Sequence, residues 1–366
     1  DREDPSIFVA FAINGGDDVF GAAEGGKFLT VWTTTPWTLP ANLAVAVHPK
    51  YTYSVVQLAT TDGPMSLVIA GDLVAQVIDA VSAKRGDWLQ GHTVIATVTG
   101  QDLLDAKLTY AHPLHADKTC PLVDADYVTL EDGTGLVHTA PGHGLDDYHT
   151  GLNHGLDIYC PVLPDGTFDE TAPAWLIGKS VWEGNPLVIA HLRDAGTLLA
   201  DKMISHSYPH DWRSKTATIF RATEQWFVSV DSPMADFGDK SLRQLAQEYC
   251  GRPLDDDGVD FIPEWGRKRM LGMLNSRPDW CLSRQRAWGL PIPVFYNPAG
   301  EPLLTPATVR TVMAKVAEHG SNIWFSQTPA ELLAGYDLAD DPAIDDPSKF
   351  DFATLTTGKD IFDVWF

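Results

Sequence analysis

The feature that most constrains this chain is the segment TTTPWTLPAN at residues 33–42. It follows residues 28–32, where β-branched and aromatic side chains predict a strand. Three successive threonines on an extended chain place hydroxyls on both faces, because side chains alternate along a strand. Pro36 cannot donate a backbone hydrogen bond and keeps the residue before it extended, so the strand ends there. We therefore expect either a strand end whose hydroxyls face a cavity or an ordinary threonine-rich edge strand before a turn.

A second segment helps to decide between these interpretations. Residues 133–148 read GTGLVHTAPGHGLDDY and follow another strand-like run at residues 127–130. The glycines at its start predict a tight turn between two strands. Together the two segments resemble the editing domain of class I aminoacyl-tRNA synthetases, and TTTPWTLPAN is similar to the isoleucyl-tRNA synthetases in particular. The valine enzymes typically have a Thr-Arg-Pro-Glu-Thr type sequence there, which this chain lacks.

The resemblance extends over nearly the whole chain. Residues 211–216 (DWRSKT) and 221–227 (RATEQWF) are similar to the segment that returns from the editing insertion to the synthetic core. Residues 277–293 resemble part of that core, and residues 360–366 resemble the start of a motif that normally continues with Asp-Ser-Gly. The resemblance implies a mixed α/β fold. A β-barrel-like editing domain (residues 1–205) would be inserted in a Rossmann-type class I core, with residues 206–366 holding part of that core and smaller connecting insertions.

Two family signatures are missing from the sequence. The chain has neither a His-Ile-Gly-His type nor a Lys-Met-Ser-Lys-Ser type signature, and both bind ATP in this family. We therefore expect an internal fragment that does not activate an amino acid. ATP and Mg²⁺ would serve the synthetic reaction of the parent enzyme, and editing would need no cofactor. Where some relatives have cysteines near the return segment, this chain has His210 and Asp211, so no metal site is carried over.

Local patterns predict further elements. Strands are predicted at residues 27–33, 51–58, 65–70, 93–98, 217–222 and 225–230. Helices are predicted at residues 145–154, 241–249, 264–276 and 305–319. A further helix should begin at Asn185 and Pro186, a cap followed by a first-turn proline, and end at Gly196.

Length and charge limit the functions that remain open. With 366 residues the chain exceeds one ordinary core, so we expect two or more domains. Its formal net charge of −23 argues against a protein that coats nucleic acid, because phosphate contacts need Lys and Arg. Charge reverses sign locally between residues 267 and 286, where either a phosphate backbone docks or a helix presents a solvated basic face. The tRNA-contact candidates are Arg267, Lys268, Arg284 and Arg286.

Other features concern the setting of the protein. The four cysteines are far apart and form no Cys-x-x-Cys pair, so neither a zinc site nor a disulfide framework is indicated. A reducing cytoplasm is the simplest environment. No apolar run is long enough to span a bilayer. We expect a cytoplasmic monomer that does not contact a membrane.

The resemblance implies hydrolysis of the ester in mischarged Val-tRNA(Ile). One methylene separates isoleucine from valine and is worth only about 1–3 kcal/mol in a pocket, a limit for which this pair is the standard example. A second, smaller pocket can admit valine and exclude isoleucine. An editing region of a related valyl- or leucyl-type enzyme is the alternative within the family.

Five side chains are the candidates for catalysis. By resemblance, Asp147 matches the partner of the substrate ammonium, although an Asp in the first turn of a helix is commonly a surface residue. His138 matches the editing histidine and could orient substrate or water, or could be structural. The remaining candidates are the pocket-lining Thr33, Thr34 and Thr35. No general base is assigned, because a vicinal hydroxyl of the tRNA could share that work.

Six further residues are candidates for binding the substrate. Two are tryptophans that could stack on the terminal adenine or pack in the core. Asn42 matches a polar family position and could equally cap a turn. The full set is Trp32, Trp37, Thr38, Asn42, His143 and Asp146.

Two other classes of function stay open. A metal hydrolase could use the clustered side chains His138, His143, Asp146, Asp147, His149 and His154. Their spacing matches no standard ligand motif, and Gly and Pro interrupt it. A non-catalytic RNA-binding module would bind tRNA without hydrolysing its ester, and the acidic balance counts against it.

Overall fold

The computed structural model describes residues 1–366 except 16, 254–255, 285–288 and 363–366. The chain divides into two compact units, Asp1–Thr223 and Glu224–Phe366. The editing-domain boundary predicted at residue 205 falls at the end of the last strand of the first unit, β10 (Leu198–His206). Among the described residues, no helix is both long and apolar enough to cross a membrane.

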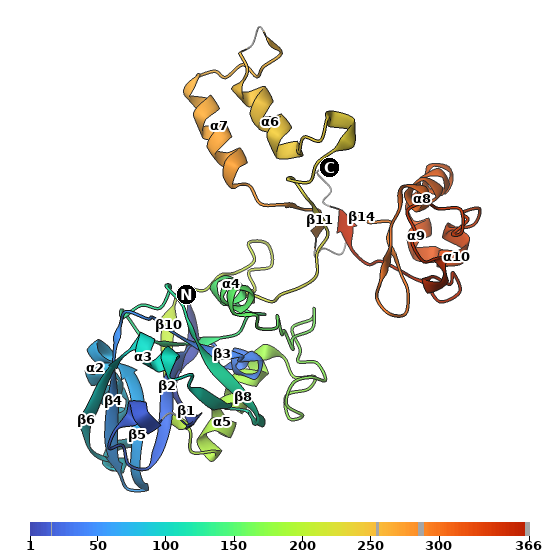
Figure 1. The fold of residues 1–366 in the computed structure, drawn as a ribbon. Coiled ribbons are helices and arrows are strands. Elements are labelled where there is room, and N and C mark those ends of the chain that lie inside the picture. Colours follow the sequence, from blue (N-terminus) through green and yellow to red (C-terminus); the bar gives the residue numbers. More distant parts are fainter. Residues whose placement is uncertain (16, 254–255, 285–288, 363–366) are drawn as a thin grey trace. The chain divides into compact units, whose positions relative to one another are not determined.

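The first unit is built on one mixed sheet of ten strands (Figure 1). Their order is β6-β4-β5-β2-β1-β7-β8-β3-β9, and β10 also pairs with β1. The pairs β2·β5 and β3·β8 are parallel and the other pairs antiparallel. Besides β10, the strands are β1 (Arg2–Asn14), β2 (Gly26–Thr33), β3 (Ala44–Val47), β4 (Thr52–Thr60), β5 (Gly63–Ala70), β6 (Leu89–Thr99), β7 (Thr109–His112), β8 (His115–Asp124) and β9 (Leu136–Thr139).

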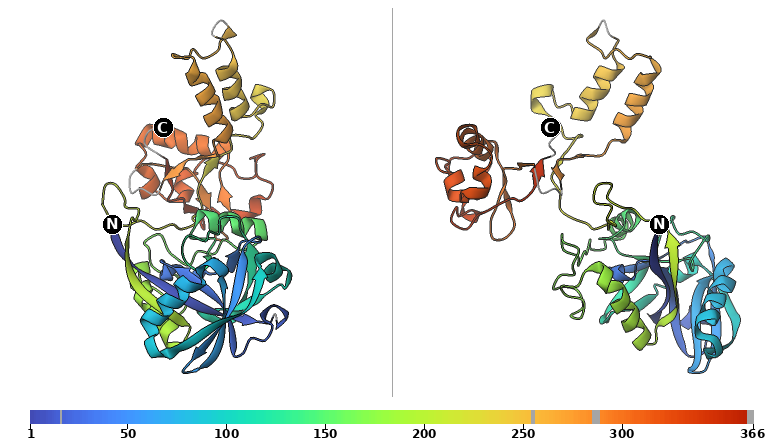
Figure 2. Two further views of the ribbon diagram at one scale, coloured as in Figure 1. Left: turned by 90° about the vertical axis from the view of Figure 1, so that its left-hand side faces the viewer. Right: turned by 180° about the vertical axis from the view of Figure 1, so that it is seen from behind.

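β1 is the central strand of this sheet. It is long enough to pair with β10 through residues 2–9, with β2 through residues 7–12 and with β7 through residues 13–14. Figure 2 shows β1 and β10 side by side. The terminal strands of the order, β6 and β9, are not paired with each other among the described residues, so the predicted barrel-like closure is not confirmed.

Helices cover this sheet and complete the core. Amphipathic α2 buries Val77, Ile78 and Val81. α5 packs near the end of β2, on the short 3₁₀ helix at Pro36–Ala41. The helices of this unit are α1 (Asp17–Phe20), α2 (Val74–Arg85), α3 (Gly100–Asp105), α4 (Leu145–His154) and α5 (Val181–Asp194).

Two local predictions between residues 127 and 196 are wrong. α5 begins at Val181 rather than at Asn185, because Ser180 and Glu183 form a capping box one turn earlier. Asn185 is then free to accept a hydrogen bond from the Trp37 backbone at 3.0 Å. Residues 127–130 form turns and loop instead of a strand, since β8 has already ended at Asp124.

The second unit consists of helices and very short strands. Its strands form one two-stranded and two three-stranded antiparallel sheets. They are β11 (Phe227–Val228), β12 (Trp280–Cys281), β13 (Ser283–Arg284), β14 (Leu290–Pro291), β15 (Phe295–Tyr296), β16 (Pro302–Leu303), β17 (Thr356–Thr357) and β18 (Ile361–Phe362). The helices are α6 (Leu242–Gly251), α7 (Trp265–Ser276), α8 (Pro306–His319), α9 (Ile323–Ser326) and α10 (Pro329–Leu332).

In the second unit, side-chain caps predicted helices well and apolar runs predicted strands poorly. Ser241 and Thr305 cap α6 and α8 as expected. The buried strand predicted at 225–230 is wrong, because only β11 forms there and both of its residues are exposed. The strand predicted at 217–222, at the end of the first unit, is wrong too, because only an isolated bridge between Ala217 and His210 forms there. The described residues of this unit form no parallel Rossmann-type sheet, so that part of the predicted architecture stays a prediction.

Candidate functional site

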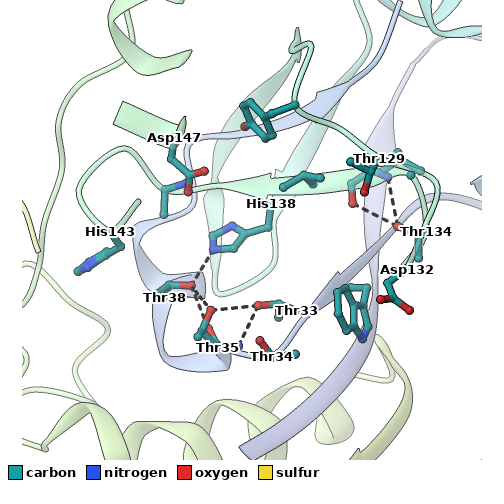
Figure 3. Close-up of a pocket in the computed structure, with 17 residues that line it drawn as sticks. Thr33, Thr34, Thr35, Thr38, Thr129, Asp132, Thr134, His138, His143 and Asp147 are labelled. Carbon is teal, nitrogen blue, oxygen red and sulfur yellow. Dashed lines mark hydrogen bonds between the residues drawn. The ribbon is translucent and has the colours of Figure 1, made fainter. Parts of the chain in front are cut away.

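A cavity of about 320 Å³ lies in the first unit, where the two sequence segments meet (Figure 3). One wall is the end of β2 with the loop that follows it, and the other comprises the 129–135 turn, β9 and the start of α4. The lining residues are Trp32, Thr33, Thr34, Thr35, Thr38, Tyr127, Thr129, Asp132, Gly133, Thr134, Gly135, Leu136, Val137, His138, Ala140, His143 and Asp147.

The threonine wall forms because β2 stops at Thr33 and the chain turns inward. The Thr33 hydroxyl accepts a hydrogen bond from the Thr35 backbone N–H at 3.1 Å. Pro36 then starts the 3₁₀ helix, and the Thr38 backbone N–H donates to the Thr35 carbonyl at 3.0 Å. Figure 3 shows the hydroxyls of Thr33, Thr35 and Thr38 in a row that ends at His138. The predicted strand end with hydroxyls on a cavity is therefore present.

The opposite rim needs glycine. Gly133 has φ +83°, and a Cβ there would lie 2.9 Å from the Trp32 ring. The Trp32 indole N–H donates to the Ser6 hydroxyl at 2.7 Å, which holds the ring in place. Two residues after Gly133, the Gly135 carbonyl accepts a hydrogen bond from the buried Tyr53 hydroxyl at 2.9 Å. The turn and the tryptophan thus fix one edge of the cavity.

Asp147 is the acid on the far wall, in the first turn of α4. Its Oδ2 accepts a hydrogen bond from the Ala140 backbone N–H at 2.9 Å. Burial raises the pKa of the Asp147 carboxyl to about 6, with the Ala140 N–H opposing this shift and the nearby Asp146 charge adding to it. The carboxylate is therefore ionised at pH 7 but held in a poorly solvated place, where a cation would be a favourable partner.

His138 is buried, and both of its ring nitrogens contact protein side chains. Nε2 lies 2.9 Å from the Thr38 hydroxyl and Nδ1 lies 2.8 Å from the Asn42 amide nitrogen. Burial lowers the pKa of His138 to about 3, and the charge of His143 adds to this. The ring therefore stays neutral at physiological pH.

His143 is held by a backbone carbonyl and stays neutral too. Its Nδ1 donates to the Phe220 carbonyl at 2.9 Å, and its buried Nε2 has no hydrogen-bond partner among the described residues. Burial lowers the pKa of His143 to about 4, opposed by the bond to Phe220. The Trp37 ring packs edge-on against it with centroids 5.1 Å apart.

The structure brings eight of the eleven catalytic and substrate-binding candidates to this cavity. These are Trp32, Thr33, Thr34, Thr35, Thr38, His138, His143 and Asp147. Trp37 packs in the core, Asn42 lies buried behind His138, and Asp146 is exposed on α4, so none of the three lines the cavity.

Sequence reasoning missed four polar residues of the lining. Tyr127 and Thr129 precede the glycine turn, and Asp132 and Thr134 belong to it. The turn prediction at 132–135 was the available signal, since residues beside a turn that carries functional side chains commonly share its site. The cavity therefore has a second carboxylate, Asp132, on an exposed part of its rim.

Two of the four tRNA-contact candidates bond to the backbone of their own unit. Arg267 pairs with Glu264 at 2.8 Å and donates to the carbonyls of Cys250 and Arg252. Arg284 donates to the Cys281 carbonyl at 2.7 Å and to the Ser283 carbonyl at 2.9 Å. Lys268 is exposed on α7, and Arg286 lies outside the described residues.

The metal-hydrolase alternative finds little support in this geometry. The part of the chain that the structure describes contains no group of three or more His, Cys, Asp or Glu side chains placed to hold a metal ion. His154 instead lies 3.1 Å from the Asp124 carbonyl, and His149 is exposed on α4.

Comparison with known proteins identifies the family. The family of class I tRNA synthetases (I, L, M and V) matches residues 28–366, and the chain belongs to it. Within that family, the chain is similar to isoleucine–tRNA ligases. It is 41% identical over 367 residues to that of Bacillus licheniformis and 40% identical over 367 residues to that of Lactobacillus helveticus, covering 100% of this chain and 35% of each relative. The ligase of Thermosynechococcus vestitus is 41% identical over 366 residues.

The chain thus spans about a third of the length of these relatives. One solved structure, "The crystal structure of GlLeuRS-CP1", matches 56% of this chain and 100% of its own, with a TM-score of 0.39 and 15% sequence identity. A likeness that slight carries no argument about this site.

Proposed function

We propose that this chain carries the editing site of an isoleucine–tRNA ligase and hydrolyses the ester of mischarged Val-tRNA(Ile). One observation carries the proposal. The TTTPWTLPAN and GTGLVHTAPGHGLDDY segments, about a hundred residues apart in sequence, line one cavity with hydroxyls on one wall and the Asp147 carboxylate on the other. Family membership and the similarity to isoleucine–tRNA ligases support this assignment.

In this proposal Asp147 binds the ammonium of the aminoacyl group. Its half-buried carboxylate accepts a hydrogen bond from Ala140 and keeps capacity for a cation. The hydroxyls of Thr33, Thr34 and Thr35 supply hydrogen bonds to the ester or the terminal ribose. A cavity of about 320 Å³ is at the small end of ligand pockets and has room for a small aminoacyl group.

The reaction is addition of water to the ester carbonyl. The water oxygen bonds to the carbonyl carbon, the ester C–O bond breaks, and the ribose oxygen leaves with a proton. His138 is neutral and bonded on both nitrogens, so we assign it a positioning role. The vicinal hydroxyl of the terminal ribose can share the proton transfer. Trp32, at the rim of the cavity, can stack on the terminal adenine.

The remainder of the chain belongs to the same proposal. All lining residues fall between 32 and 147, within the proposed editing domain of residues 1–205. We assign residues 206–366 to part of the synthetic core, with tRNA(Ile) as partner. The two ATP-binding signatures of the family are absent from these residues, so ATP and Mg²⁺ chemistry is left to the parent enzyme and no step is derived through them.

The decisive experiment compares two esters on the purified 366-residue chain. Val-tRNA(Ile) should lose its valine much faster than Ile-tRNA(Ile) loses isoleucine, measured as acid-precipitable radiolabel over time. Thr34→Arg should suppress this hydrolysis at least about 100-fold by filling the cavity, while Thr61→Arg, on an exposed turn, should not. Binding of tRNA without ester loss would instead indicate a non-catalytic RNA-binding module.

A further inference from the structure

A chain of hydrogen bonds runs behind the threonine wall, from the core to the cavity. The Tyr110 hydroxyl contacts Oδ1 of Asn42 at 2.5 Å, and the Asn42 amide nitrogen lies 2.8 Å from Nδ1 of His138. Nε2 of His138 lies 2.9 Å from the Thr38 hydroxyl, which lies 2.9 Å from the Thr35 carbonyl. Only Thr35 and Thr38, at one end, and His138 line the cavity. Tyr110 and Asn42 are completely buried.

The direction of the hydrogen bonds is fixed at the core end by a backbone carbonyl. The Asn42 amide nitrogen also lies 2.9 Å from the Ala44 carbonyl, which can only accept. The amide –NH₂ must therefore face Ala44 and His138, and its oxygen must face the Tyr110 hydroxyl. Nδ1 of His138 is then the acceptor of an amide hydrogen.

A second backbone carbonyl gives the same answer at the cavity end. The Thr38 hydroxyl lies 2.9 Å from the Thr35 carbonyl, which can only accept, and 2.9 Å from Nε2 of His138. With Nδ1 an acceptor, the single ring hydrogen of neutral His138 is on Nε2, which donates to the Thr38 hydroxyl. The hydrogen of that hydroxyl then points to the Thr35 carbonyl, so the contacts at the cavity end agree with the tautomer fixed at the core end.

We infer that Tyr110 and Asn42 are positioning residues that fix the Nε2–H tautomer of His138, and that this tautomer holds the Thr38 hydroxyl on the Thr35 carbonyl. In this inference Asn42 holds His138 in place and does not make the substrate contact that the sequence had suggested. It also gives a role to Tyr110, which sequence reasoning did not single out. Its effect on rate rests on the proposed editing function, whereas the tautomer is a property of the free protein.

The sheet explains why these residues meet. Pairing of β3 with β9 places Val45 opposite His138, which brings the imidazole beside Asn42 and Ala44 just before that register. Tyr110 comes from β7, which pairs with β1 and β8. In the other tautomer, Nδ1–H would face an amide N–H, and a bare Nε2 would compete with the Thr35 carbonyl for the Thr38 hydrogen. The threonine loop would then lose a bond that closes it.

The test is a measurement of the His138 tautomer by ¹⁵N NMR on the full chain labelled in histidine, without tRNA. Because the chain has 12 histidines, the His138 signals are identified as those that disappear in the His138→Gln variant. In the wild type we expect Nδ1 of His138 to have the ¹⁵N chemical shift of an unprotonated nitrogen and Nε2 that of a protonated one, with no change between pH 5 and 8.

The variants test what fixes the tautomer. Asn42→Asp should move the hydrogen to Nδ1 by replacing the amide donor with an acceptor. Tyr110→Phe should give a mixture, and Tyr159→Phe, a hydroxyl deletion outside this chain of bonds, should leave the tautomer unchanged.

Deacylation of Val-tRNA(Ile) provides the second readout. We expect kcat to fall roughly 10-fold in Tyr110→Phe and up to about 100-fold in Asn42→Asp, with KM within about 3-fold of wild type, as for other support residues of a site. Wild-type His138 with its hydrogen on Nδ1, or unchanged tautomer and kcat in Asn42→Asp, would overturn the inference. Absence of deacylation in wild type together with the expected tautomer would instead refute the proposed function and leave the tautomer assignment standing.

Discussion

The two units of this chain differ in how they obtain a core. In the first, strands of four to thirteen residues bury one large continuous cluster that includes Ile7, Leu29 and Leu67. In the described part of the second, the strands have two residues each, and a small cluster forms around Phe295 and Trp324. Large side chains such as Trp265 and Phe325 are more than 60% exposed there. A well-packed sheet holds side chains more precisely than a lightly packed unit does. The candidate site accordingly lies on the first unit.

Removal of the half-buried acid Asp147 should have the largest effect of the changes compared. Asp147→Ala deletes the proposed partner of the ammonium, and loss of one member of a desolvated charge pair costs about 2–5 kcal/mol. We expect deacylation of Val-tRNA(Ile) to fall about 100-fold or more, measured as kcat/KM. Asp79→Ala, an exposed acid on α2, is the matched control and should retain the wild-type rate. An Asp147→Ala protein with wild-type kcat/KM would contradict the role assigned to this residue.

Truncation of one leucine in each core should show that the two cores are separate. Leu67 in β5 and Leu303 in β16 are both completely buried, and Leu→Ala at such positions costs about 2–5 kcal/mol. We expect Leu67→Ala to destabilise only the first unit and Leu303→Ala only the second, with the greater loss in the larger core. Hydrogen exchange read by peptide mass spectrometry in urea can follow both units at once. Leu152→Ala, which is exposed on α4, should change neither by more than about 0.5 kcal/mol. Coupled loss of protection in both units would show one cooperative core.

Neutralising Asp147 should stabilise the first unit while it inactivates the site. The folded pKa of about 6 lies above the ordinary carboxyl pKa of 3.8, so stability is greatest below about pH 3.8, where the carboxyl is protonated, and falls as pH rises from there through about 6. Asp147→Asn removes this penalty and still accepts from Ala140. At pH 8 we expect a gain of at most about 3 kcal/mol in the free energy of unfolding, and no gain at pH 4. Equal stability of the two proteins at pH 8 would argue against a desolvated carboxylate.

The same ionisation should set the acid limb of the pH profile. Only the carboxylate form of Asp147 pairs with the ammonium, so kcat/KM should fall by about tenfold per pH unit below about 6. His138 and His143 have pKa values lowered by burial to about 3 and about 4, so neither should contribute a transition near neutrality. The rate of spontaneous ester hydrolysis, measured without protein, is subtracted at each pH. A profile with a single transition near 7 would point to a histidine instead.

The sequence by itself determined the elements whose cause is local. β2 ends at Thr33, shortly before Pro36 starts the 3₁₀ helix, and α8 begins where Thr305 can cap it, because those effects act within a few residues. The motifs also indicated the family, and eight of the eleven candidates that they supplied line the cavity. Local apolar runs determined less, since residues 217–222 form no strand and only an isolated bridge from Ala217 to His210.

Tertiary structure alone decided how the site is supported. Asn42 supports His138 because β3 pairs with β9 in one register, and Tyr110 reaches Asn42 from a third strand. The Asn185 side chain accepts a hydrogen bond from the Trp37 backbone N–H because α5 packs on the 3₁₀ helix. Asn185 is available for this bond because Ser180 caps α5 in its place. Each of these contacts joins residues far apart in the chain, so its partner depends on strand register and helix packing, which no local pattern specifies.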